Sequence, residues 1–138
     1  MRLSESTRLI QKNLQDAEAL LGLGDYHQAS EKFWGAAATS VKAIAEQRGW
    51  PHQSHRDLHR VVSTLAQETG RPEVIDRFNL ASSLHTNFYE DWLTPAEVMR
   101  LAASARELLN VFVRLAEPQS EEEEDGPGAK RNSADAKK

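Results

Sequence analysis

The chain has 138 residues, of which 28% are charged and 39% hydrophobic, and its formal net charge is −4. This length supports one domain with a hydrophobic core and is too short for two ordinary domains. There is neither a run of about eighteen apolar residues nor a charged-then-apolar leader, so we expect no membrane span and no secretion. The lack of cysteine excludes disulfides and thiolate metal sites and fits a reducing, cytoplasmic location.

Acidic residues are concentrated near the C-terminus. Residues 117–138 contain seven acids and four bases, so this segment carries −3 and residues 1–116 carry about −1. A dedicated nucleic-acid binder is usually strongly basic, and the composition does not point to that class. A local basic groove is still compatible with a near-neutral domain.

Apolar residues recur at helical spacing over most of the chain, and no segment keeps the period of two that a strand requires. The first helix is predicted from Leu3 to Leu21, before a glycine-containing turn at 22–24. Asp25 then caps a second helix, with Gln28 completing a capping box. That helix ends at residues 49–51, which contain a glycine and a proline. Its predicted inner face consists of Tyr26, Ala29, Phe33, Ala36, Ala37, Val41 and Ile44.

Three further helices follow. Ser54 and Asp57 form a capping box for a shorter third helix, which Gly70 ends. Pro72 suits the first turn of the fourth helix. The sequence Thr-Pro-Ala-Glu at 94–97 supplies an N-cap, a proline at the first helical position and a glutamate at the third, so it predicts the start of the fifth helix.

The helical pattern ends at Pro118. Residues 119–138 contain acids, glycine, proline, serine and lysine but no aromatic residue, and such a segment cannot bury enough surface to offset its ordering entropy. The sequence therefore predicts an all-α fold: an antiparallel bundle of four to five helices in residues 1–117, followed by a disordered acidic tail in 118–138. The run Glu121–Asp125 is a solvated charge run by default, and it also suits a partner's basic groove or mimicry of nucleic acid.

Several short motifs occur in an order that resembles a known superfamily. They are Gly24-Asp25-Tyr26, then Ala36-Ala37 with Val41-Lys42-Ala43, then His55 with Leu58, and finally Ala81, Leu84-His85 and Asn87-Phe88-Tyr89-Glu90. Their order and spacing resemble the HEPN superfamily (higher eukaryotes and prokaryotes nucleotide-binding), and most of all its archaeal PaREP branch. The resemblance covers nearly the whole predicted bundle, whereas the tail has no counterpart.

The resemblance implies a HEPN-like helical bundle that pairs into a two-fold homodimer. Many HEPN proteins are metal-independent ribonucleases of toxin–antitoxin, CRISPR or phage-defence systems, and others are non-catalytic partners of small nucleotidyltransferases. The active members carry an arginine followed roughly four to six residues later by a histidine, and the two copies of this motif meet across the dimer.

This chain has the ribonuclease motif only in displaced form. Seven residues separate Arg77 from His85, and on a helix the two side chains would lie about 12 Å apart along the axis. That is too far for joint action on one phosphate within one subunit, so we interpret the protein as leaning away from catalysis. If it is an enzyme, the candidate catalytic residues are Arg77, His85, Asn87 and Tyr89, with the arginine stabilising phosphate charge and the histidine transferring a proton. Otherwise His85 and Asn87 would hydrogen-bond backbone where the fourth helix ends.

Lys42 and Trp34 are candidate binding residues. Lys42 lies within an otherwise apolar face, where it would form a buried salt bridge, extend its ammonium to solvent or bind a nucleotide phosphate. Trp34 adjoins the core-facing Phe33 and is expected to point outward, where an aromatic residue often marks an interface.

Three histidines, His52, His55 and His59, cluster at the start of the third helix. His55 and His59 have the spacing of two zinc ligands, but Arg56 stands where a zinc-protease motif has glutamate, and no third ligand is evident. We therefore expect no metal and no cofactor, and interpret these residues as one helix-capping histidine and two exposed ones.

The sequence thus predicts a small cytoplasmic HEPN-like homodimer that serves as a non-catalytic component of a prokaryotic toxin–antitoxin or defence system. Its partner would be a nucleotidyltransferase or another protein, or else RNA or a nucleotide. The first alternative is a metal-independent ribonuclease toxin that brings Arg77 and His85 together from two subunits. The second is a tetratricopeptide-like interaction module, suggested by Gly24–Ala36, although no second repeat follows.

Overall fold

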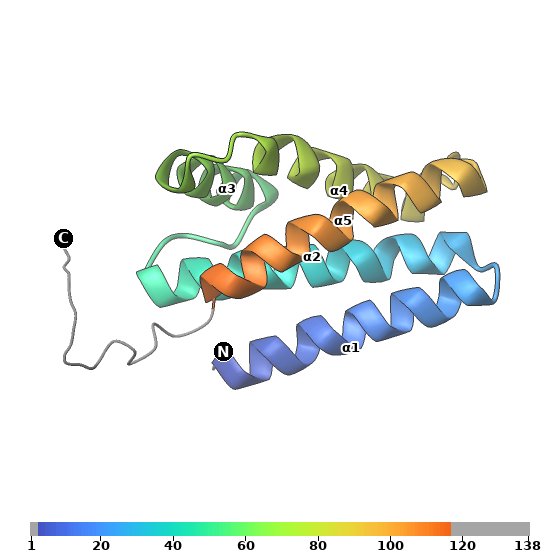
Figure 1. Ribbon diagram of the computed structural model, residues 1–138, viewed down its shortest axis with the longest axis horizontal. Coiled ribbons are helices and arrows are strands. Elements are labelled where there is room, and N and C mark those ends of the chain that lie inside the picture. The colour runs from blue at the N-terminus through green and yellow to red at the C-terminus, as the bar shows by residue number, and fades with distance from the viewer. Residues whose placement is uncertain (1–2, 117–138) are drawn as a thin grey trace.

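The computed structural model describes residues 3–116, which form five α-helices and no strand (Figure 1). The helices are α1 (Leu3–Gly22), α2 (Tyr26–Arg48), α3 (His55–Thr69), α4 (Glu73–Glu90) and α5 (Pro95–Ala116). The prediction of an all-α bundle is confirmed, and the segment predicted as a disordered tail lies outside the described residues. Among the helices of residues 3–116, none combines the length and apolar character needed to cross a membrane.

Helix α2 is the centre of the bundle, because it contacts each of the other four helices. α1 and α2 form one antiparallel hairpin, and α4 and α5 form a second one, so the α1–α2 and α4–α5 turns lie at the same end of the molecule (Figure 1). α3 lies beside α4 at the opposite end. The close approach of neighbouring helices fits the small, fully buried residues of α2, which include Ala29, Ala36, Ala37 and Ala45.

Two main groups of buried side chains hold the bundle together. The larger one joins α2, α3, α4 and α5 around Phe78 and Phe112, whose ring centroids are 6.5 Å apart in an edge-to-face arrangement. The second lies at the end with the two turns, around Phe33 and Leu84. Each such side chain, fully removed from water, stabilises the fold by about 1.5–3 kcal/mol.

The helix ends follow the local signals closely. Gly49 and Gly70 adopt left-handed conformations, with φ of 71° and 68°, which glycine alone adopts readily. The capping box at Ser54 and Asp57 is complete, with both reciprocal bonds present. The box predicted at Asp25 is half formed: its carboxylate accepts a bond from the Gln28 N–H at 3.0 Å, and the described residues show no return bond from the Gln28 side chain.

Candidate functional site

Four rings from three helices lie against one another on the side of the bundle where α2, α3 and α4 meet. Trp34 of α2 stacks on His55 of α3 and on His85 of α4, with centroid distances of 5.5 and 5.2 Å. The two histidine rings stack on each other at 5.2 Å. Tyr89, one turn after His85, meets the His85 ring edge-on at 5.3 Å. We call Trp34, His55, His85 and Tyr89 the ring cluster.

One side of the ring cluster is buried and the other side is exposed to solvent. Trp34 is only 6% exposed and also contacts Phe78 of the core, whereas Tyr89 is 70% exposed; His55 is exposed and the His85 side chain is 22% exposed. The prediction that Trp34 points outward is therefore wrong. α2 is surrounded by other helices, so its buried face is wider than one stripe and includes the residue next to Phe33.

His85 is held in place by a carboxylate. Its Nδ1 atom lies 2.9 Å from Oε1 of Glu31, one turn before Trp34 on α2. An ionised carboxylate only accepts hydrogen bonds, so Nδ1–H is the donor and Nε2 is left for other contacts. The expectation that His85 bonds backbone is thus replaced by a side-chain pair between α4 and α2.

Asn87 has a structural role at the turn between α4 and α5. It is 1% exposed, its Nδ2 donates to the Ser30 hydroxyl at 3.0 Å, and its Oδ1 accepts from the backbone N–H groups of Trp92 and Leu93 at 2.9 and 2.8 Å. All these groups would lose their partner if the amide were absent. The expected backbone bond of Asn87 is present, and this buried side chain does not reach the surface of the ring cluster.

Arg77 faces a different helix from His85. Its guanidinium donates to the Ser104 hydroxyl at 3.2 Å and pairs with Glu107 at 2.8 Å, both on α5. Within one chain the structure does not bring Arg77 and His85 together. Their meeting across two subunits stays a prediction.

Lys42 does not lie in an apolar face as predicted. It is exposed, although its neighbours Val41 and Ala43 are buried. The sequence neighbours of a helical residue point elsewhere, because successive positions are rotated by about 100°. Its assignment as a binding residue stays a prediction.

The three histidines near the start of α3 have separate surroundings. His52 Nδ1 bonds the Trp50 carbonyl oxygen at 2.9 Å, His55 stacks in the ring cluster, and His59 meets the Phe78 ring edge-on at 4.9 Å. Partial burial, and secondly the nearby His55, lower the pKa of His59. His52 and His59 are half-buried rather than exposed, and Ser54, not a histidine, caps the helix. In the described part of the chain, no three His, Cys, Asp or Glu side chains are placed to hold a metal ion.

Glu31 is the member of this site that the sequence analysis did not single out. Its spacing of three residues from Trp34 puts both on one face of α2, just as the spacing of four puts His85 and Tyr89 on one face of α4. This spacing groups side chains within each helix. It does not reveal that the two groups, more than fifty residues apart, face each other.

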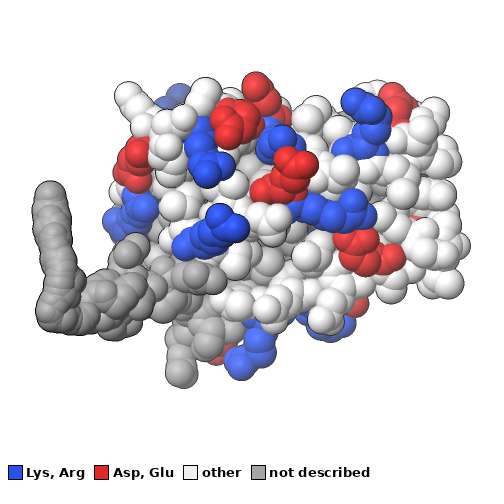
Figure 2. Space-filling view, in the orientation of Figure 1, with Lys and Arg blue, Asp and Glu red and all other residues white. Residues whose placement is uncertain are grey.

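Charge is unevenly distributed along the bundle. Residues 13–31 and 78–99, which include the α1–α2 and α4–α5 turns, contain seven acids and neither lysine nor arginine, although Arg106 of α5 reaches Glu18 in this region. The rest of residues 1–116 contains thirteen lysines and arginines against seven acids. Figure 2 shows basic side chains on one face of the molecule, with acids between them. The ring cluster draws residues from both regions.

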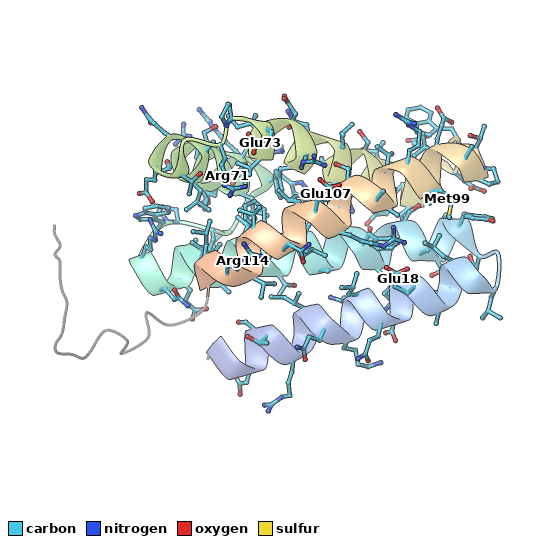
Figure 3. The ribbon with its side chains drawn as sticks, viewed as in Figure 1. Glu18, Arg71, Glu73, Met99, Glu107 and Arg114 are labelled. Atoms are coloured by element: carbon cyan, nitrogen blue, oxygen red, sulfur yellow. The ribbon has the colours of Figure 1, made fainter. Side chains whose placement is uncertain are left out.

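A shallow groove of about 260 Å³ on the α4–α5 side illustrates how basic side chains are balanced by acids (Figure 3). The groove is lined by Arg71 of the α3–α4 turn, by Glu73 at the start of α4, and by Glu107 and Arg114 of α5. Arginines and glutamates alternate there, so the groove is not a strong anion site. The ring cluster is therefore the stronger candidate.

The comparisons with known proteins agree with this architecture. No curated protein matches the chain. A crystal structure of a protein from Sulfolobus solfataricus is similar, with a TM-score of 0.70 and 24% sequence identity, covering 79% of this chain and 97% of that one; this likeness shows the fold alone. A sequence model of the archaeal PaREP1/PaREP8 family matches residues 5–109, which include the whole ring cluster. This match confirms the PaREP part of the resemblance, and membership of the wider HEPN superfamily stays a prediction. This chain belongs to the archaeal PaREP1/PaREP8 family.

Proposed function

We propose that this chain is a HEPN-like, homodimeric component of a prokaryotic toxin–antitoxin or defence system, and that it binds single-stranded RNA at the ring cluster without cleaving it. The observation that carries this proposal is the exposure of His55 and Tyr89 above a buried Trp34. Proteins bind unpaired bases by stacking them on aromatic and histidine rings, which is possible for every base because each has a flat face.

The charges around the site support RNA as the ligand. Arg56 is exposed on the first turn of α3, next to His55 in the sequence. A strand stacked on the rings would place its phosphates toward this arginine and away from the acidic end of the bundle. Binding should therefore weaken as salt is added, in proportion to the few phosphates that are neutralised.

Binding without cleavage fits the contacts of the candidate catalytic residues. Arg77 is paired with Glu107 and Asn87 is bonded at the α4–α5 turn, so neither is placed to act beside His85 within one chain. A ribonuclease would need an arginine from a second subunit to approach His85. Ribonuclease activity is therefore the alternative to binding without cleavage.

The test is fluorescence anisotropy of a labelled single-stranded RNA 12-mer at low salt. We expect Tyr89→Ala and His55→Ala each to weaken binding about tenfold, as loss of a stacking ring does. Trp92→Ala is the matched control, because Trp92 is similarly exposed, at 65%, and lies outside the ring cluster. No RNA binding, or equal loss in the control, would contradict the proposal.

The same samples separate the alternatives. Light scattering measures whether the protein is a dimer, and a gel measures RNA cleavage. Cleavage that is lost in His85→Ala would establish the ribonuclease instead. A monomer that binds peptides would favour the tetratricopeptide-like module, and co-purification would identify a nucleotidyltransferase or other protein partner.

A further inference from the structure

A separate pocket lies between the α2–α3 loop and α3. Its volume is about 310 Å³ and its lining residues are Trp50, Pro51, Asp57, Arg60, Val61 and Thr64. None of them belongs to the ring cluster. Pockets of this size lie at the lower limit for small ligands, so this one has room for a ligand of about one nucleotide and not for a longer chain.

The indole of Trp50 forms a fixed wall of this pocket. It is half-buried and packs against the larger core group. Its backbone N–H donates to the Ala45 carbonyl oxygen at 2.9 Å, and the Arg48 guanidinium carbon lies 5.0 Å from the ring centroid. Arg48 is in turn paired with Glu68 at 2.5 Å. A flat wall that is already ordered loses little entropy when a planar ligand stacks on it.

Arg60 is the charge that the pocket offers to a ligand. The other charged wall residue, Asp57, accepts bonds from the backbone N–H groups of Gln53 and Ser54 at 3.1 and 3.3 Å. These bonds, with a contribution from Arg60, hold the pKa of Asp57 below its ordinary value. Within residues 3–116, Arg60 has no carboxylate within 4.0 Å.

A neutral acceptor completes the lining. Thr64 donates its hydroxyl to the Arg60 carbonyl oxygen at 3.0 Å, so its lone pairs face outward as acceptors. The pocket thus combines the indole of Trp50, the apolar side chains of Pro51 and Val61, the Arg60 guanidinium, one hydroxyl acceptor and the Asp57 carboxylate, whose Oδ2 is already bonded to backbone. This set suits a planar, partly polar ring that carries an anionic group.

We propose that this pocket binds one nucleotide unit, with the base stacked on Trp50 and the phosphate on Arg60. The ligand class rests on the proposed function, but the site is distinct from the ring cluster. A free nucleoside monophosphate and the phosphorylated end of an RNA strand share this chemistry. The experiment separates these two sources.

The test uses the indole N–H signals of the full chain in two-dimensional NMR, since the protein has only three tryptophans. Each signal is assigned by substitution with phenylalanine. Uridine and adenosine 5′-monophosphates are added in turn, followed by the two nucleosides and by inorganic phosphate. We expect the monophosphates to shift the Trp50 signal and to leave the Trp92 signal unchanged.

Variants test the two halves of the site. Trp50→Leu should weaken nucleotide binding about tenfold. Arg60→Gln, an exposed change that leaves the core intact, should weaken the monophosphates about fivefold and leave the nucleosides unaffected. Arg8→Gln, a change at an exposed position of α1 outside both the pocket lining and the ring cluster, is the matched control and should bind as the native protein does.

The outcomes distinguish this site from the ring cluster. Tyr89→Ala should lose affinity for the RNA 12-mer and keep the Trp50 shift with monophosphates. An unchanged Trp50 signal at millimolar nucleotide, or equal binding by Arg60→Gln, would overturn the inference whether or not RNA binds the ring cluster. If the site takes RNA ends, a 5′-phosphorylated 12-mer will compete with the monophosphate and the 5′-hydroxyl 12-mer will not.

Discussion

His85 Nδ1 and Glu31 Oε1 lie 2.9 Å apart across the contact between α4 and α2. This pair holds the imidazole so that its face lies on Trp34 and its edge meets Tyr89. The histidine is thereby part of the packing between two helices as well as part of an exposed surface. Because the His85 ring is held in one orientation, it is suited to stack against the ring of a ligand.

Replacing Glu31 with glutamine should have a small effect on stability. The side chains of His85 and Glu31 are 22% and 33% exposed, and even a fully charged pair that water reaches contributes at most about 1 kcal/mol. We expect Glu31→Gln to lower the free energy of unfolding by less than about 1 kcal/mol in urea titrations. Glu107→Gln, which breaks the Arg77 pair on the other side of α4, is the matched control; a loss several times greater for Glu31→Gln would refute this reasoning.

Replacing Asn87 with alanine should be far more damaging. The change removes a buried amide and leaves the Ser30 hydroxyl and two backbone N–H groups without their partner. Each unsatisfied buried group costs about 1–3 kcal/mol, so we expect a loss of about 3 kcal/mol in the free energy of unfolding. Asn79→Ala, an exposed position on the same helix, should cost less than about 0.5 kcal/mol. If the variant kept normal stability but lost an RNA-cleaving activity of the native protein, Asn87 would instead be a catalytic residue.

The stability of the fold should decrease in mild acid because of His59. Burial and His55 lower its pKa in the folded state, so the unfolded chain binds a proton more readily. The stabilisation is complete above the ordinary histidine pKa of about 6.5 and is lost as the pH falls through the lower folded value. Urea titrations between about pH 7.5 and 5 should show this decrease, and His59→Leu should reduce it. An identical decrease in the variant would assign the effect to other groups.

The capping box of α3 should contribute measurably to stability. The Ser54 hydroxyl accepts a bond from the Asp57 N–H at 3.0 Å, and removal of such a cap costs about 1 kcal/mol. We expect Ser54→Ala to lower the free energy of unfolding by about this amount in thermal or urea denaturation. Ser63→Ala, at an exposed position in the same helix, should have little effect. Equal free energies of unfolding for the Ser54→Ala and Ser63→Ala variants would mean that the cap does not stabilise the fold.

The helices and their ends were predictable because their signals are local. A capping box such as Ser54 with Asp57, or a glycine such as Gly70 at a helix end, depends on atoms within one or two turns of the chain. The all-α class follows from the spacing of apolar residues, which needs no knowledge of how the helices meet.

The candidate site was only partly predictable because it depends on how helices cross. His85 and Tyr89 were singled out from their motif, but their contacts with Glu31 and His55 join α4 to α2 and α3. Trp34 was misplaced for a related reason: one apolar stripe was assumed for a helix that is packed on several sides. Helix packing decides such positions, and a single sequence shows it only indirectly.

The segregation of charge has a consequence for encounters in solution. The segments that include the α1–α2 and α4–α5 turns carry an excess of acids, and the rest of residues 1–116 carries a surplus of lysine and arginine, so the bundle has an electric polarity along its length. A polyanion would feel this field before contact and approach the α3 end preferentially. Added salt should then slow association more than it speeds dissociation, because screening acts on the approach. The protein and the polyanion would thus be oriented relative to each other before any base contacts the ring cluster.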